Sequence, residues 1–371
     1  RACAVVDRAA EDPVVLDRKA HAAAAASTGV ARLPFLALGL LVVAGCLQPG
    51  GDGPGPDDGG AATEPAVRFV ALGDMGTGGE DQARVAAAIG AVCAERGCDF
   101  AVGLGDLIYP AGAASPTDPQ FDTKFEAPYA ALDFPFWMVL GNHDNGQDPA
   151  GVTSPGGGLG FWYTAGNNEV AYAQRTDRAS EKWTMPARHY TFDSGAVHFI
   201  GLDTNTLLFY GVPVPPDLGA EVQAQEQWLP GAVSSGAGPW RIALGHHPYV
   251  SNSEHGNAGE YDGRPIPGQD GDHLKTIFEA ELCDRIDLYI AGHDHVLQWL
   301  EPVPACGRTQ FIVSGGGGAE LYTLPGDGPV FYQEESLGFW WIEVRGDTLH
   351  AVAFDDAAMP LFEQSVSKPI A

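Results

Sequence analysis

Short runs of apolar residues recur along the chain, and most of them end in a small polar cluster. Such runs cover residues 67–72, 100–104, 136–140, 197–202, 241–244 and 288–291. Continuous apolar runs of this length indicate strands that are buried on both faces, as in the sheets of α/β proteins. After the first run, Val85, Ile89 and Val92 recur at helical spacing and predict a helix over Asp81–Cys93.

A polar residue directly follows a glycine at the end of five of these runs. The clusters are Gly73-Asp74, Gly105-Asp106, Gly141-Asn142-His143-Asp144, Gly245-His246-His247 and Gly292-His293-Asp294-His295. Because ligands of open α/β sheets bind at the carboxyl ends of strands, the clusters are candidates for one shared site. Imidazole and carboxylate groups suit Zn, Fe and Mn, and the clusters contain no thiolate. They offer more ligands than one tetrahedral ion needs, which favours two metal ions with a bridging carboxylate.

The first 64 residues have the composition of a leader and a tether. Residues 33–45 are an apolar run after Arg32, shorter than the roughly 20 residues of a membrane-spanning helix, and the run ends in Val43-Ala44-Gly45-Cys46. This ending resembles the signal of bacterial lipoproteins, in which the cysteine is lipidated. We therefore expect residues 1–45 to be a leader, with a translation start at Val30 that leaves residues 1–29 untranslated. Residues 46–64, rich in Gly, Pro and Asp, are expected to form a flexible tether.

This interpretation predicts an exported protein, anchored to a bacterial membrane through Cys46, or secreted if that residue is an ordinary part of a signal peptide. Export permits disulfides. Apart from Cys3 and Cys46, the cysteines are at positions 93, 98, 283 and 306. Proximity favours the pairs Cys93–Cys98 and Cys283–Cys306 among the three possible pairings, and four free thiols are the alternative.

The charge of the chain limits its partners. The sequence has 48 Asp and Glu against 20 Lys and Arg, a formal net charge of −28. Binding to the phosphate backbone of nucleic acids, or to an anionic lipid surface, needs clustered basic residues, so both partners are excluded and only a lipid anchor would hold the chain at a membrane. A small phosphoester remains compatible, because the local charge of a metal site determines its binding.

Taken in order, the clusters resemble the five blocks of the calcineurin-like metallophosphatases. The blocks are Gly73-Asp74-Met75-Gly76, Gly105-Asp106-Leu107-Ile108-Tyr109, Gly141-Asn142-His143-Asp144, Gly245-His246-His247-Pro248 and Gly292-His293-Asp294-His295. Tyr109, three residues after Asp106, is typical of purple acid phosphatases, and residues 66–355 are similar to their small, tartrate-resistant type. The resemblance implies a catalytic domain over residues 65–365. It also implies an α/β (α+β) four-layer sandwich, in which two mixed β-sheets are flanked by helices and a dinuclear metal site lies at the carboxyl ends of the strands.

The resemblance assigns roles to individual residues. Asp74, Asp106, Tyr109 and His295 would bind the first metal ion, Fe(III), and Asp106, Asn142, His246 and His293 would bind the second, a divalent Fe, Zn or Mn ion. Asp106 would bridge the two ions. His143 and His255 would contact the phosphate and assist proton transfer, and Asp144 would hold His143 in place. His247 stands where the family often has tyrosine, and it adds a titratable group beside the site.

The implied activity is that of a hydrolase, an acid phosphatase. It would cleave small phosphomonoesters by in-line attack of a metal-activated hydroxide. Three alternatives remain open at this point. They are a phosphodiesterase or nucleotide phosphatase with the same site, a non-catalytic surface lipoprotein that binds metal or a partner, and redox chemistry at an iron pair. No oligomeric state is predicted.

Overall fold

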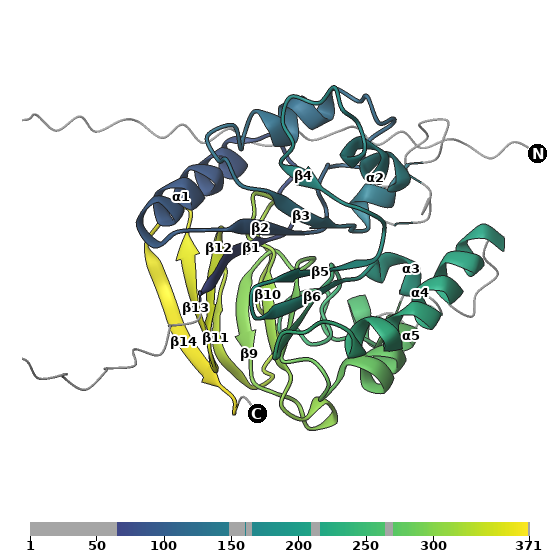
Figure 1. Cartoon of the computed structure of the whole chain (residues 1–371), viewed down its shortest axis with the longest axis vertical. Coiled ribbons are helices and arrows are strands. Elements are labelled where there is room, and N and C mark those ends of the chain that lie inside the picture. The colour runs from purple at the N-terminus through teal and green to yellow at the C-terminus, as the bar shows by residue number, and fades with distance from the viewer. Residues whose placement is uncertain (1–64, 148–159, 161–164, 209–215, 264–269, 370–371) are drawn as a thin grey trace, which may run out of the picture. The chain divides into compact units, whose positions relative to one another are not determined.

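The computed structural model describes residues 65–147, 160, 165–208, 216–263 and 270–369. The predicted leader and tether lie outside these described residues. Figure 1 shows that the described part is built around two β-sheets, with helices on their outer sides. None of its described helices has the length and apolar character needed to cross a membrane.

The first sheet has seven strands in the order β14-β13-β12-β1-β2-β3-β4. They are β1 (Val67–Leu72), β2 (Phe100–Leu104), β3 (Phe136–Val139), β4 (Trp183–Thr184), β12 (Gly338–Arg345), β13 (Thr348–Asp355) and β14 (Pro360–Ser367). β1 to β4 are parallel, whereas β12 to β14 are an antiparallel addition. The two parts join where Val67 of β1 pairs antiparallel with Val344 of β12.

The second sheet also has seven strands, in the order β11-β9-β10-β8-β7-β6-β5. They are β5 (Tyr190–Ser194), β6 (Val197–Gly201), β7 (Trp240–Leu244), β8 (Leu288–Ala291), β9 (Leu297–Leu300), β10 (Gln310–Ser314) and β11 (Val330–Glu334). β6, β7, β8 and β10 are parallel, and antiparallel strands complete both edges. Both sheets are therefore mixed, as the resemblance implied.

Helices cover the outer face of each sheet. The helical elements are α1 (Glu80–Arg96), η1 (Asp122–Glu126), η2 (His143–Asn145), α2 (Asn167–Ala173), α3 (Thr204–Leu208), α4 (Pro216–Ser234), η3 (Tyr261–Gly263), α5 (Asp272–Ile277), η4 (Phe278–Leu282) and η5 (Pro304–Cys306). α1 buries Val85, Ile89 and Val92 against the first sheet, which confirms the predicted helix. α3, α4 and α5 contribute to the core over the second sheet.

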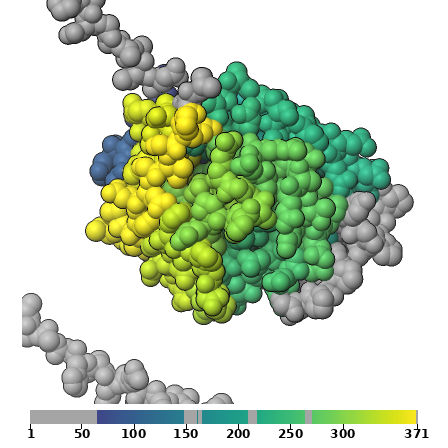
Figure 2. All heavy atoms as spheres, turned by 90° about the horizontal axis from the view of Figure 1, so that it is seen from below, coloured from purple at the N-terminus to yellow at the C-terminus, as the bar shows by residue number. Residues whose placement is uncertain are grey.

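A third apolar core lies between the two sheets. It includes Phe69 and Trp340 from the first sheet and Phe199, Trp240 and Trp299 from the second, all buried. Apolar residues thus cover both faces of the central strands, which explains why these strands lack polar alternation. The layers are helix, sheet, sheet, helix, and the predicted four-layer sandwich is confirmed. Figure 2 shows a face on which the yellow C-terminal segment lies beside the yellow-green segment before it.

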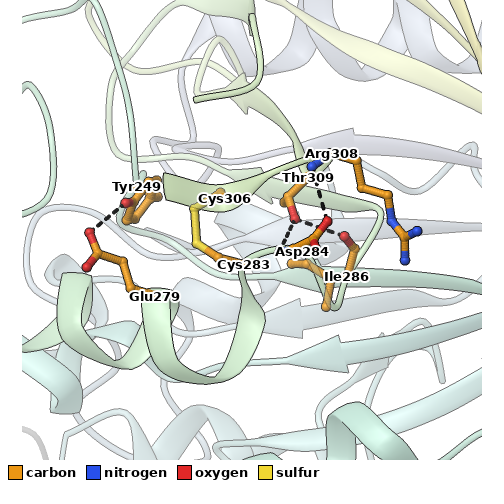
Figure 3. Close-up of a disulfide and its surroundings, with 8 residues drawn as sticks. All are labelled: Tyr249, Glu279, Cys283, Asp284, Ile286, Cys306, Arg308 and Thr309. Atoms are coloured by element: carbon orange, nitrogen blue, oxygen red, sulfur yellow. Dashed lines mark hydrogen bonds between the residues drawn. A yellow bond between two sulfur atoms is a disulfide. The ribbon is translucent and has the colours of Figure 1, made fainter. Parts of the chain in front are cut away.

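Both favoured disulfides are present. Cys93–Cys98 closes the end of α1, and Cys283–Cys306 links the segment after η4 to η5. Figure 3 shows the second disulfide beside a network in which Thr309 accepts a hydrogen bond from the Asp284 amide and donates one to the Ile286 carbonyl. The disulfide and this network join the segment between η4 and β8 to the segment between β9 and β10.

Candidate metal centre

The polar clusters predicted from the sequence meet at one edge of the fold. Asp74, Asp106 and Asn142 follow β1, β2 and β3 of the first sheet, whereas His246 and His293 follow β7 and β8 of the second. The parallel strands of both sheets therefore end at the same place. A hydrogen bond of 2.8 Å between His246 Nδ1 and the Leu104 carbonyl joins the two sets of strand ends.

Four residues form a first group around the Tyr109 hydroxyl. Its oxygen lies 3.1 Å from Asp74 Oδ1, 3.0 Å from Asp106 Oδ2 and 3.1 Å from His295 Nε2. His295 Nε2 is also 3.3 Å from Asp74 Oδ1. These are the four residues predicted to bind the first metal ion.

A second group surrounds His246 Nε2. This nitrogen lies 2.8 Å from Asn142 Oδ1, 3.2 Å from His293 Nδ1 and 3.4 Å from Asp106 Oδ1. Asp106 thus contacts both groups, one through each carboxylate oxygen. The geometry places all seven predicted ligand residues in one cluster, with Asp106 at its centre.

The cluster has more hydrogen-bond acceptors than donor protons, which indicates that it suits cations. His246 Nδ1 and His295 Nδ1 each face a backbone carbonyl, which only accepts hydrogen bonds, so both rings carry their proton there. With a proton on Nδ1 alone, each Nε2 would turn its lone pair toward other acceptors, including Asn142 Oδ1 and Asp74 Oδ1, unless it binds a second proton or a cation. The single hydroxyl proton of Tyr109 likewise faces three acceptors. Lone pairs that converge in this way fit bound metal ions, and the chemistry of the donors suits first-row metals.

The pKa shifts of Tyr109 and Asp106 also indicate that the buried site suits a cation. Burial raises the pKa of the Tyr109 phenol well above its ordinary value, and the neighbouring Asp106 and Asp74 carboxylates raise it further. Burial alone would also raise the pKa of Asp106, but the facing His246 and His143 rings hold it well below its usual range. A cation in the cluster would stabilise both oxygens in their ionised form.

Three predicted ligands have backbone conformations that are unusual for their residue type. Asp74, Asp106 and His293 have φ angles of 58°, 52° and 70°, in the left-handed region that favours glycine. Such residues cost on the order of 1–3 kcal/mol each and cluster at functional sites. In each case the residue is the second after a buried strand, so the turn directs its side chain across the strand end.

The glycine before a ligand has a steric role at two positions. A Cβ atom on Gly141 would collide with the Asp106 carboxylate, and one on Gly105 would lie 2.5 Å from His246 Nδ1. Gly105 also has a φ of 86°, a conformation that side chains other than glycine rarely adopt. These close approaches explain why glycine precedes the polar residue in the sequence pattern.

Asp144 holds two of the metal-binding loops together. Its Oδ1 accepts hydrogen bonds from the amides of Leu107 and Ile108 at 2.8 and 3.2 Å, and its Oδ2 accepts one from Gly141 at 2.7 Å. Asp144 therefore binds the backbone of the loops after β2 and β3 rather than the His143 imidazole. His143 Nδ1 instead lies 2.6 Å from the Pro110 carbonyl, and its Nε2 is 3.8 Å from Asp106 Oδ2.

His255 lies over the second group. Its ring stacks on His293 with centroids 4.0 Å apart, and its Nδ1 is 2.6 Å from Asp262 Oδ1. Burial alone would lower the pKa of His255, but the hydrogen bond to Asp262 and the charge of Asp294 raise it above its ordinary value. The role of Asp262 was missed in the sequence, because it lies seven positions after His255 and no motif includes it.

His247 is buried beside His293, with ring centroids 4.5 Å apart. The Thr204 hydroxyl accepts the amide protons of His246 and His247 at 3.2 and 3.1 Å, so its own proton is available for His247 Nδ1 at 2.9 Å. His246, His247 and His293 also form a group that could hold a metal ion. The hydrogen bonds of Thr204, which follows β6, could not be derived from sequence spacing.

Comparisons with known proteins identify the family and the relatives that the chain resembles. The family model described as calcineurin-like phosphoesterase matches residues 67–297. Purple acid phosphatase 4 of Arabidopsis thaliana is 27% identical over 82% of this chain and 84% of its own length. Tartrate-resistant acid phosphatase type 5 of Sus scrofa is 24% identical over 83% of this chain and 88% of its own length.

A solved structure shares the fold at lower sequence identity. The structure titled "GAP50 the anchor in the inner membrane complex of Plasmodium" superposes with a TM-score of 0.63. The match covers 82% of this chain and 90% of that one, at 17% identity.

Proposed function

Because the chain belongs to the calcineurin-like phosphoesterase family, we propose that it is an exported acid phosphatase that releases phosphate from small phosphomonoesters at a dinuclear metal site. The observation that carries the proposal is the position of Asp106, which contacts both ligand groups through different carboxylate oxygens. The similarity to purple and tartrate-resistant acid phosphatases supports the choice of monoesters.

We assign Fe(III) to Asp74, Asp106, Tyr109 and His295, and a divalent Fe, Zn or Mn ion to Asp106, Asn142, His246 and His293. When bound, the two ions would supply Lewis-acid polarisation of the phosphoryl group and a nucleophilic water at a lowered pKa. The Tyr109 phenol suits the more highly charged ion, since it needs a strong cation to ionise in a buried acidic cluster.

His143 and His255 are the proposed acids that would protonate the leaving alcohol. Both have Nδ1 engaged, His143 with the Pro110 carbonyl and His255 with the Asp262 carboxylate, so Nε2 is the nitrogen that would exchange a proton with substrate. His255 is the stronger candidate for the acid, because Asp262 stabilises its protonated ring. An acid that stays protonated at low pH fits an acid phosphatase.

A substrate panel tests the proposal. Metal-loaded protein is assayed at acid pH with 4-nitrophenyl phosphate, a sugar phosphate, a mononucleotide and bis(4-nitrophenyl) phosphate. We expect the monoesters to be cleaved faster than the diester. A diester rate far above every monoester rate would make the protein a phosphodiesterase, and no hydrolysis of any ester would make it a non-catalytic metal-binding protein.

Export and lipid anchoring are a separate part of the proposal. They rest on the apolar run before Cys46 and on the Gly- and Pro-rich segment after it. Mass spectrometry of the mature protein is expected to find Cys46 at the N-terminus with a lipid attached. An unmodified peptide that spans Cys46 would contradict the anchor.

A further inference from the structure

A short segment between β10 and β11 lies directly against His295. We name residues 320–323 the strap. The Glu320 carbonyl is 2.5 Å from His295 Nδ1, and the Tyr322 amide donates a hydrogen bond to the His295 carbonyl at 3.3 Å. The Tyr322 ring is stacked on the imidazole, with centroids 3.9 Å apart and planes inclined by 12°. The strap therefore contacts His295 by its backbone and by its ring.

These contacts fix the state and the orientation of the imidazole. A carbonyl accepts only, so the Glu320 contact places the proton of His295 on Nδ1 and leaves the lone pair on Nε2. Nε2 is the nitrogen that faces Tyr109 and Asp74. One hydrogen bond leaves the ring free to tilt about it, whereas a flat ring stacked on the imidazole face opposes that motion.

The strap is itself held at both sides. The Ala319 amide, just before it, donates to the Asp74 carbonyl at 3.1 Å. Glu254 Oε1 accepts hydrogen bonds from the Thr323 amide and hydroxyl at 3.0 and 2.9 Å. The Ser253 hydroxyl donates to the Thr323 carbonyl at 2.8 Å. The strap is thus tied to the loop of one predicted ligand and to the segment that carries His255.

We propose that Tyr322 is a positioning residue that holds His295 in the orientation needed to bind the first metal ion. This inference rests on the metal site of the proposed function, and it adds a residue that lies outside the seven ligands. The Tyr322 ring also contacts His255 edge-on, with centroids 5.3 Å apart, so it packs between two residues of the site. Residues that orient metal-bound histidines typically change metal affinity by about 10–100-fold when they are replaced.

The test measures metal binding rather than catalysis. The full-length protein is stripped with a chelator and titrated with Zn²⁺ alone by calorimetry, as wild type and as the Tyr322→Ala, Tyr322→Leu and Tyr322→Phe variants. Leucine preserves apolar volume without a flat face, and phenylalanine preserves the face without the hydroxyl. Tyr332→Ala is the matched control, because Tyr332 also stacks on a ring, Phe362 at 4.9 Å, away from the site.

We expect Tyr322→Ala and Tyr322→Leu to weaken one of two Zn²⁺ sites by at least about 10-fold, with the other site within twofold of wild type. Tyr322→Phe and Tyr332→Ala should bind both ions with wild-type affinity. Wild-type affinity at both sites in Tyr322→Leu would overturn the inference and leave the metal site intact. Equal weakening of both sites by Tyr322→Leu and Tyr332→Ala would show a general loss of stability, which also overturns it. A wild-type protein that binds no Zn²⁺ would refute the metal site itself, and the role of Tyr322 with it.

Discussion

Arg188 offers a quantitative test of how the two sheets are joined near the site. Its guanidinium donates to Asp203 Oδ2 at 2.7 Å, to Asn167 Oδ1 at 3.0 Å and to Asn145 Oδ1 at 3.0 Å. The two charged side chains are 7% and 1% exposed. Asp203 follows β6 of the second sheet, whereas Asn145 follows β3 of the first and donates to the Gly141 carbonyl beside the metal-binding loop. The ion pair therefore connects both strand-end regions.

The perturbation is Arg188→Met, which keeps much of the apolar stem and removes the charge. It leaves the Asp203 carboxylate buried without its cation. Loss of one partner of a buried pair costs about 3–5 kcal/mol of unfolding free energy. At about 2–4 °C per kcal/mol for a domain of comparable size, the unfolding temperature should fall by roughly 6–20 °C.

The assay is denaturant unfolding of chelator-treated protein, followed by tryptophan fluorescence, so that metal binding does not add to the measured stability. The double variant Arg188→Met/Asp203→Leu removes both charges and should recover at least about 2 kcal/mol relative to the sum of the two single variants. If Arg188→Met costs less than about 1 kcal/mol, or if the two single losses simply add, the buried pair is not the link described above.

Three further predictions concern the site, the disulfides and the pH dependence of stability. Tyr109→Phe should abolish the visible charge-transfer band of the Fe(III)-loaded protein, because the phenolate oxygen is gone; a spectrum that keeps the band would place iron elsewhere. Removing the Cys283–Cys306 disulfide, with a sequence separation of 23, should cost about 3.4 kcal/mol in chemical denaturation, against about 2 kcal/mol for Cys93–Cys98 with a separation of 5. A larger loss for the shorter loop would contradict this order. Burial lowers the pKa of His189, so its contribution to stability is present above the unfolded pKa of about 6.5 and is lost as the pH falls through that value toward the folded pKa. Wild type should therefore lose more unfolding free energy between pH 7 and pH 5 than His189→Gln, and equal losses would refute the assignment.

The sequence predicted the parts of the fold in which a buried strand ends in a polar cluster. β1, β2, β3, β6, β7 and β8 all lie where apolar runs indicated strands. The antiparallel strands β12 to β14 were not predicted, because no polar cluster follows them and their place is set by a long-range pairing such as Phe69 with Ile342. β14 is also half exposed along its length, so it lacks the continuous burial of the central strands.

Five of the seven ligand candidates directly follow a glycine at the end of a strand, and the resemblance to the phosphatase family added Tyr109 and His295. Their supporting residues could not be predicted, since the relevant contacts join distant segments. Asp262 contacts His255 directly, although a loop separates the two in the sequence. The strap contacts His295, although Glu320 lies 25 residues further along the chain. Such contacts depend on how loops pack over the strand ends, which local spacing does not determine.

The most direct test of the dinuclear phosphatase site is phosphate release as a function of bound metal. Chelator-stripped wild type is titrated with metal, and hydrolysis of 4-nitrophenyl phosphate at acid pH is measured alongside metal content. We expect no activity without metal, full activity only at two ions per chain, and a loss of at least about 1,000-fold in Asp106→Asn at the same metal concentration. Undiminished hydrolysis by metal-free protein, or by Asp106→Asn, would contradict a phosphatase built on a dinuclear centre bridged by Asp106.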